Sequence, residues 1–161
     1  MALILFDTNI FIDMLNGVHQ ASVELASYDA AAISYITYME LRVGEIARPH
    51  EKPILDALLD EFLIVDMNKT IMEAAIKIRG GSLITRPAIK LPDAIIAATA
   101  WARGYPIVTR NAKDFVAAGV TVHVPYDYDS TTGLVTNVRA PFEPTSKAVS
   151  KGGRPTLTRL R

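Results

Sequence analysis

Four acidic residues in separate segments of the chain could together form a metal site, and they are Asp7, Glu40, Asp93 and Asp114. Carboxylates that lie close together repel one another and are driven toward protonation unless a cation lies between them. In a chain without cysteine and without clustered histidine, an all-oxygen ligand set suits a hard ion, Mg²⁺ or Mn²⁺. Such an ion lowers the pKa of a bound water and neutralises phosphoryl charge. The chemistry indicated is hydrolysis of a phosphodiester bond by a metal-activated water.

Each of these acids also has a local structural explanation. Asp7 follows an apolar run and begins a helical segment, so it could simply cap that helix. Asp93 comes just after a proline in the first turn of a helix, where an acid interacts favourably with the helix dipole. Asp114 lies three residues after Asn111, which fits a cap followed by a first-turn acid. Glu40 lies within a helical segment, where most glutamates face solvent. Local rules therefore leave both explanations open.

The segments that must position the acids alternate between strands and helices. Apolar runs predict strands at 2–6, 31–34, 63–66, 106–110 and 120–124. Helical periodicity or capping residues predict helices between them, after Asp7 up to Gly17, over about 19–28, from Ser34 to Arg48, from Glu51, from Asn68 until Gly80-Gly81 stops the helix, from Pro92 to Gly104, and from Asn111.

Repeated strand, helix, strand units imply a parallel sheet that is covered by helices on both faces. We therefore expect a three-layer α/β/α sandwich with a central parallel sheet of about five strands. The carboxyl ends of parallel strands meet at one edge of the sheet, where α/β proteins form their crevice. This topology predicts that Asp7 and Asp114 lie at the same edge, and that Glu40 and Asp93 can reach it from helices.

The charge of the 161-residue chain is balanced in total but uneven along its length, with 17 basic and 17 acidic side chains. Residues 1–126 carry 11 basic and 14 acidic side chains, and residues 127–161 carry 6 and 3. An acidic body is not the usual footprint of a nucleic-acid binder, so an RNA substrate would require bound cations or a local basic patch. Residues 127–161 are also rich in Pro, Gly, Ser and Thr, which predicts a flexible tail after one folded domain at 1–126.

The apolar runs are short, and none reaches the roughly 20 residues that a helix needs to cross a bilayer. We expect neither a membrane span nor a signal peptide. The absence of cysteine is consistent with a reducing compartment, so we expect the protein in the cytoplasm.

Other polar residues near the predicted edge have secondary roles. Thr109 could donate a hydrogen bond to a carboxylate or to a metal-bound water, or it could bond to the backbone. Arg110 and Lys113 flank Asp114 and could contact RNA phosphates, although a solvated basic helix start is the simpler explanation. The three histidines, His19, His50 and His123, lack the spacing of metal ligands and are assigned no role.

Four stretches of the sequence resemble, in order and spacing, the motifs of PIN-domain proteins, and especially of VapC-like toxins of type II toxin-antitoxin pairs. They are FDTNIFIDML at 6–15, ISYITYMEL at 33–41, LPDAIIAATA at 91–100 and VTRNAKDF at 108–115. The resemblance covers roughly residues 2–126 and implies a PIN-like nuclease domain there. The tail at 127–161 has no counterpart in the family pattern.

The resemblance assigns the catalytic and metal-binding roles to the four acids, Asp7, Glu40, Asp93 and Asp114, and it makes Asn9, Thr109 and Asn111 their supports. It implies an Mg²⁺- or Mn²⁺-dependent endoribonuclease acting on single-stranded or loop RNA as the toxin of a toxin-antitoxin system. It also implies a homodimer and a small cognate antitoxin protein, with which a higher hetero-oligomer could form.

Two alternatives compete with this function. A phosphatase of the haloacid dehalogenase type would need a second aspartate two residues after the first, where this chain has Asn9. A non-catalytic PIN-like scaffold that binds RNA or protein stays open, but the presence of all four acids argues against it.

Overall fold

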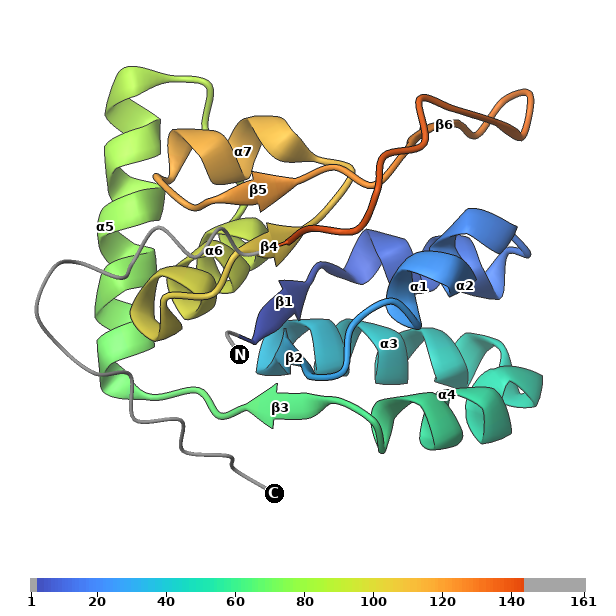
Figure 1. Ribbon diagram of the computed structural model, residues 1–161. Helices are drawn as coiled ribbons and strands as arrows, with labels where there is room; N and C mark the ends of the chain where they lie inside the picture. The colour runs from blue at the N-terminus through green and yellow to red at the C-terminus, as the bar shows by residue number, and fades with distance from the viewer. Residues whose placement is uncertain (1–2, 144–161) are drawn as a thin grey trace, which may run out of the picture.

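The computed structural model describes residues 3–143, and its centre is a five-stranded parallel sheet with helices on both faces (Figure 1). The strands are β1 (Ile4–Phe6), β2 (Ala31–Ser34), β3 (Leu63–Val65), β4 (Ile107–Val108) and β5 (Val122–His123), in the spatial order β3-β2-β1-β4-β5. The helices are α1 (Thr8–Leu15), α2 (His19–Leu25), α3 (Tyr35–Ala47), the 3-10 helix η1 (Pro49–Glu51), α4 (Lys52–Leu59), α5 (Lys69–Thr85), α6 (Leu91–Arg103) and α7 (Ala112–Ala117). The predicted three-layer α/β/α sandwich is confirmed.

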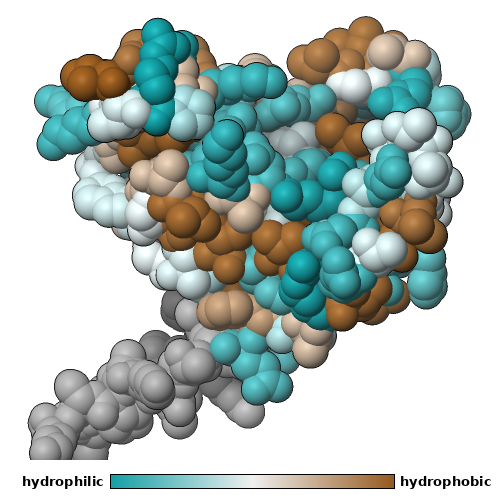
Figure 2. Space-filling view, turned by 90° about the horizontal axis from the view of Figure 1, so that it is seen from above, coloured by the Kyte–Doolittle hydropathy of each residue, from teal (hydrophilic) through white to brown (hydrophobic). Residues whose placement is uncertain are grey.

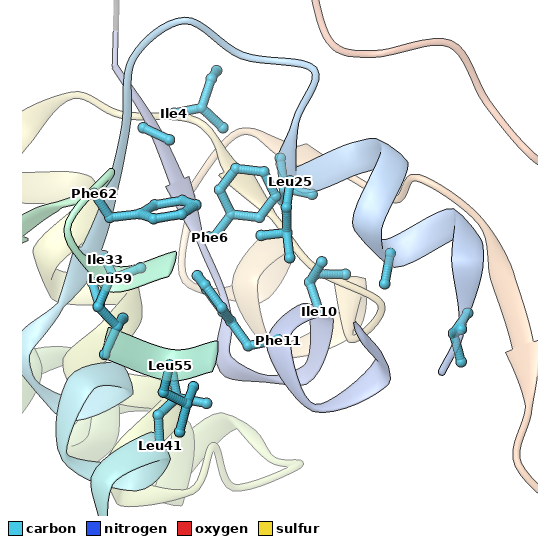
Figure 3. Packing of buried hydrophobic residues seen from close by; sticks show 14 of the residues in the cluster. Ile4, Phe6, Ile10, Phe11, Leu25, Ile33, Leu41, Leu55, Leu59 and Phe62 are labelled. Atoms are coloured by element: carbon cyan, nitrogen blue, oxygen red, sulfur yellow. The ribbon is translucent and has the colours of Figure 1, made fainter. Parts of the chain in front are cut away.

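Alternation along the strands divides the core between the two faces of the sheet. In β1, Ile4 and Phe6 point to one face, where they pack with α1, α2 and α4. Leu5 points to the other face, where it packs with α5, α6 and α7. On the first face, Phe6 contacts Phe11 and Phe62 edge to face, with ring centroids 6.2 Å and 5.8 Å away (Figure 3). Both helix layers are therefore fixed by the same three-residue strand.

The order of the strands creates a switch point beside β1. From β1 the chain moves outward through β2 and β3, and it then crosses to β4 and β5 on the other side. β1 and β4 pair in register, with Phe6 opposite Val108, and the amide N–H of Asp7 donates to the Val108 carbonyl at 3.0 Å. Crevices in open α/β sheets form where neighbouring strands leave in opposite directions. The ends of β1 and β4 therefore define the edge at which a site is expected.

Helix α5 does not end at Gly80-Gly81, and this prediction from the sequence was wrong. The helix runs through both glycines to Thr85 and packs along α6. Its last turns are held by the loop that follows, because the Ser82 hydroxyl accepts from the Ile89 amide at 3.0 Å and the Arg79 guanidinium donates to the Ile89 carbonyl at 2.6 Å. A helical glycine costs only about 1 kcal/mol relative to alanine. Packing against α6 and these hydrogen bonds offset that cost.

Helix α3 is present as predicted, but most of its apolar stripe faces outward. The buried positions are Thr37 and Leu41, whereas Met39, Val43 and Ile46 are 48%, 60% and 82% exposed. Helical spacing identifies a helix without telling which face the rest of the chain will cover. Part of this helix is therefore available to a partner.

A small antiparallel hairpin follows the main sheet, formed by β6 (Asp127–Asp129) and β7 (Leu134–Thr136). Near the end of the described chain, the amide of Phe142 donates to the Tyr28 hydroxyl at 2.7 Å. The sequence did not predict this hairpin, because each strand has only three residues and the first, Asp127–Asp129, carries two acids. The remainder of the predicted flexible tail, 144–161, lies outside the described residues. Within residues 3–143, no helix is long and apolar enough to cross a membrane.

Candidate active site

Asp7 lies at the end of β1 and is both a helix cap and a buried acid. Its side chain is nearly buried, with 4% of the residue exposed. One oxygen, Oδ1, accepts from the backbone N–H of Thr8 at 2.8 Å, which caps α1. The other, Oδ2, accepts from the Thr109 hydroxyl at 2.7 Å and from the Asn9 side-chain amide at 3.1 Å. Capping uses only one oxygen, so the local explanation does not account for the contacts of the second.

The environment of Asp7 disfavours its charged form. Together the surroundings raise the pKa of Asp7 from 3.8 to about 6, and burial is the largest cause. The negative charges of Asp93 and Glu40 raise the pKa further, while the hydrogen bonds from Thr109 and Thr8 oppose the shift. The carboxylate is therefore held where its charge is not compensated by the protein.

Glu40 reaches the site from α3. Its pKa is raised, first by burial and then by the charge of Asp93. The Thr8 hydroxyl lies between α1 and α3, 3.3 Å from Oε1 of Glu40 and 3.0 Å from the Thr37 hydroxyl. The residue after Asp7 therefore connects this glutamate to the end of β1.

Asp93 and Asp114 complete the acidic edge from α6 and α7. Burial raises the pKa of Asp93, the charge of Asp114 raises it further, and the nearby Lys90 lowers it. The side-chain amide of Asn111 donates to Oδ2 of Asp114 at 3.1 Å. Asn111 precedes α7, but its side chain makes no capping hydrogen bond, so the cap that its position suggested is not formed. Asp93 thus lies within electrostatic reach of each of the other three predicted acids.

The acids have the ligand atoms that a divalent cation prefers, but their side chains do not form a complete coordination sphere. Among residues 3–143, no three Asp, Glu or His side chains are arranged to hold a metal ion as they stand. Mg²⁺, however, keeps several waters and is usually bound through one or two carboxylates. The raised pKa values of Asp7, Glu40 and Asp93 show negative charge that a cation would stabilise. Oxygen ligands alone, with uncompensated charge, match a hard ion.

Asn9, Thr109 and Asn111 are brought together around Asp7. The Thr109 hydroxyl donates to Asp7 and accepts from the Asn9 side chain at 3.2 Å and from the Asn111 amide at 2.9 Å. The side-chain oxygen of Asn9, Oδ1, accepts from the backbone amide of Arg110 at 3.3 Å. The turn that follows β4 is therefore tied to the residues that follow β1.

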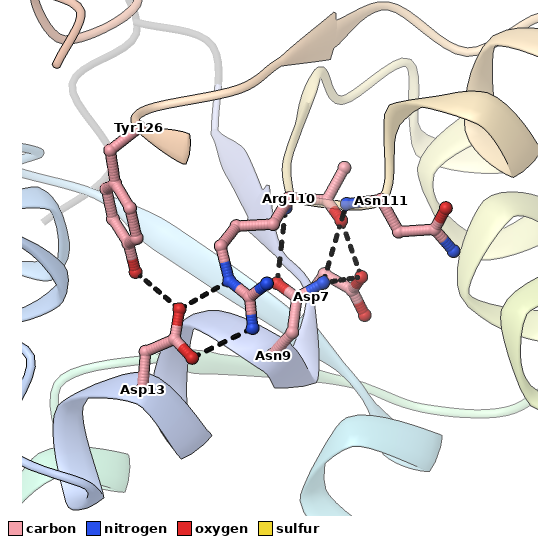
Figure 4. A network of polar contacts seen from close by, with 7 residues as sticks. Asp7, Asn9, Asp13, Arg110, Asn111 and Tyr126 are labelled. Carbon is pink, nitrogen blue, oxygen red and sulfur yellow. Dashed lines mark hydrogen bonds and ion pairs between the residues drawn. The ribbon is translucent and has the colours of Figure 1, made fainter. Parts of the chain in front are cut away.

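Arg110 and Lys113 are placed differently from each other. Lys113 is exposed at the start of α7. The Arg110 guanidinium forms a two-point ion pair with Asp13, at 2.5 Å from Nε to Oδ2 and 2.9 Å from Nη2 to Oδ1 (Figure 4). The Tyr126 hydroxyl donates to the same carboxylate at 2.8 Å. Two nitrogens of Arg110 are therefore engaged inside the protein.

Sequence reasoning missed several residues of the site region, namely Thr8, Asp13, Thr37 and Tyr126. Asp13 had a usable signal, because it is an acid between Ile12 and Met14 within the predicted first helix, four residues after Asn9. Tyr126 carried no comparable signal, since it lies at the point where periodicity in the sequence ends.

Comparisons with a family model and with known proteins find relatives of this chain. Residues 4–119 match the model of the PIN domain. The plasmid stability protein StbB of Pseudomonas syringae pv. tomato is 30% identical over 142 residues, covering 78% of this chain and 99% of that protein.

Solved structures give the same result. A toxin-antitoxin complex from Klebsiella pneumoniae contains a chain with 39% identity and a TM-score of 0.65, covering 77% of this chain and 98% of its own. FitAcB from Neisseria gonorrhoeae contains one with 28% identity and a TM-score of 0.65, covering 76% and 98%.

Proposed function

Because the chain belongs to the PIN-domain family, we propose that it is the toxin of a toxin-antitoxin pair and acts as an Mg²⁺- or Mn²⁺-dependent endoribonuclease on single-stranded or loop RNA. The observation that carries the proposal is the convergence of Asp7, Glu40, Asp93 and Asp114. The charges of neighbouring acids in this group raise the pKa values of Asp7, Glu40 and Asp93. Acids that only cap helices or face solvent would not need to lie together at one edge of the sheet.

The residues of the chain have distinct parts in this reaction. Asp7 is fixed by three hydrogen bonds, so it provides a rigid anchor for a cation together with Asp93, while Glu40 and Asp114 flank the pair. Mg²⁺ or Mn²⁺, when bound, would lower the pKa of a bound water and neutralise charge on the phosphoryl oxygens. Asn9, Thr109 and Asn111 hold Asp7 and Asp114 in place through the contacts described above.

The distribution of charge over the fold supports RNA as the substrate. Residues 3–66 contain eleven acidic and three basic side chains, and residues 67–126 contain three acidic and eight basic ones. Residues 67–126 form the strands β4 and β5 and the helices α5, α6 and α7. These three helices cover one face of the sheet (Figure 1). A groove of about 360 Å³ between α5 and α7 is lined by Lys77, Thr85 and Arg86 among others. Lys90 lies close enough to Asp93 to lower its pKa, so the basic face adjoins the acids.

Exposed apolar side chains support a protein partner. Tyr35, Met39, Val43 and Ile46 form a stripe along α3, with exposed fractions from 45% to 82%. Hydrophobic patches are also visible in the space-filling view from above (Figure 2). Contiguous exposed apolar surface marks interaction sites. We assign the α3 stripe to a second copy of the chain and expect a cognate antitoxin to bind elsewhere on the dimer.

A cleavage assay on mixed single-stranded and structured RNAs tests the nuclease. The wild-type protein should cleave in Mg²⁺ or Mn²⁺ and lose activity in EDTA, and Asp7→Asn and Asp93→Asn should be inactive. The matched control is Asp60→Asn, which removes an exposed acid at the C-terminal end of α4 that is not one of the four site acids. Equal cleavage by wild type and both site variants would overturn the mechanism, and RNA binding without cleavage would favour a non-catalytic scaffold.

The toxin role is tested separately in cells. Expression of the wild-type chain should slow growth, and co-expression of the small protein encoded beside it should restore growth. Normal growth on expression of an active nuclease would argue for RNA maturation or decay instead.

A further inference from the structure

Asp13 is a buried carboxylate that the proposed reaction does not use. Only 1% of the residue is exposed, and it is one of the buried residues of α1. A buried carboxylate is costly unless it is paired and hydrogen-bonded. Asp13 meets this condition with three hydrogen bonds, two from the Arg110 guanidinium and one from the Tyr126 hydroxyl.

Arg110 connects this buried acid to the active edge through its backbone. It lies between Thr109 and Asn111, whose side chains contact Asp7 and Asp114 respectively. Its own backbone amide donates to the side-chain oxygen Oδ1 of Asn9. That bond sets the orientation of the Asn9 amide, so that its NH₂ group faces Asp7 and Thr109. A shift of Arg110 would therefore move the donors that hold both aspartates.

Tyr126 and Tyr128 close the network from the other side. Tyr126 is fully buried, and it directly precedes the hairpin of β6 and β7. The Tyr128 ring of β6 lies against the Arg110 guanidinium, with 5.4 Å from Cζ to the ring centroid. Figure 4 shows Asp13 between the Tyr126 hydroxyl and the guanidinium, with Asn9 and Asp7 beyond. Tyr126 and Tyr128 lie past residue 119, where the family match ends.

We propose that Asp13, Arg110 and Tyr126 form a positioning network that fixes the turn after β4 and thereby sets the affinity of Asp7 and Asp114 for a divalent cation. Arg110 is then a positioning residue rather than a contact to RNA phosphate. The inference rests on the proposed function, because it assumes a cation at the acidic edge. Residues that orient metal ligands typically change metal affinity or activity by about 10- to 100-fold when they are replaced.

The test is Mn²⁺ affinity of the purified full-length protein, measured by isothermal titration calorimetry, with circular dichroism as a check of folding. Arg110→Lys keeps the charge but loses the two-point fork, and we expect affinity to fall about 10-fold. Tyr126→Phe removes only the hydroxyl and should lower affinity in the same direction by a smaller factor. The matched control is Arg48→Lys, because Arg48 pairs with Glu51, another buried acid, at the far end of α3 from Glu40. This control should leave Mn²⁺ affinity unchanged.

Arg110→Gln separates positioning from phosphate contact. Loss of a phosphate contact would reduce the slope of log RNA affinity against log salt by about 1 and leave Mn²⁺ binding intact. A positioning role predicts instead that Mn²⁺ affinity falls and that the salt slope of RNA binding stays as in wild type. Wild-type Mn²⁺ affinity in folded Arg110→Lys, Arg110→Gln and Tyr126→Phe would overturn the network while leaving the proposed function standing. A wild-type protein that binds no Mn²⁺ would overturn the proposed function and this role with it.

Discussion

Replacing Asp7 with asparagine should change how the stability of the protein depends on pH. Burial and neighbouring acids raise the pKa of Asp7 from 3.8 to about 6. The folded state therefore binds a proton on this group more tightly than the unfolded state does. Ionised Asp7 then destabilises the fold at pH 7 by about 3 kcal/mol relative to its protonated form. The sign follows directly: stability from this group increases as the pH falls through 6 toward 3.8.

The size of the effect can be stated for a practical pH range. Between pH 7 and pH 5 the folded group becomes mostly protonated while the unfolded group stays ionised, so the wild-type protein gains about 1 kcal/mol from Asp7. Asp7→Asn lacks this gain. Glu40 and Asp93, whose pKa values are also raised, titrate in both proteins and largely cancel in the comparison.

Urea unfolding in EDTA at pH 7 and pH 5 measures the difference. The comparison uses the change between the two pH values, because asparagine also disturbs the hydrogen bonds from Asn9 and Thr109 and so alters absolute stability. Asp60→Asn, which removes an exposed acid, should behave as wild type. Mg²⁺ added at pH 7 should stabilise wild type more than Asp7→Asn. An equal pH dependence of wild type and Asp7→Asn in EDTA would show that Asp7 is not held in the environment described.

The remaining predictions concern surfaces and local structure. Lys77→Ala and Arg86→Ala in the groove between α5 and α7 should each weaken RNA binding and reduce its salt slope by about 1, measured by fluorescence anisotropy, whereas Lys52→Ala on the acidic side should not. Val43→Glu in the exposed stripe of α3 should convert a dimer into a monomer in size-exclusion chromatography with light scattering, and an unchanged mass would exclude this stripe as the interface. Asn68→Ala removes the hydrogen bond that the Ile71 amide donates to Oδ1 of Asn68 at the start of α5, so the free energy of unfolding should fall by about 1 kcal/mol in urea denaturation.

Much of the fold could be predicted because its signals are local. The apolar runs around β1, β2 and β3 and the Asn68 cap of α5 identify elements from a few neighbouring residues. The end of α5 could not be predicted in this way. Whether a helix continues through two glycines depends on what packs against it and on bonds to a distant residue, here Ile89.

The sequence by itself determined the chemical character of the site, since the types and order of Asp7, Glu40, Asp93 and Asp114 define an acidic, oxygen-only group. Their environments were decided only by the tertiary structure, because burial and the charges of residues far apart in the chain set the pKa of Asp7. The same is true of Asp13 and Tyr126, which are 113 positions apart and meet only because the chain returns past α1 after β5. Local sequence specifies which groups are present, and folding specifies which of them share one place.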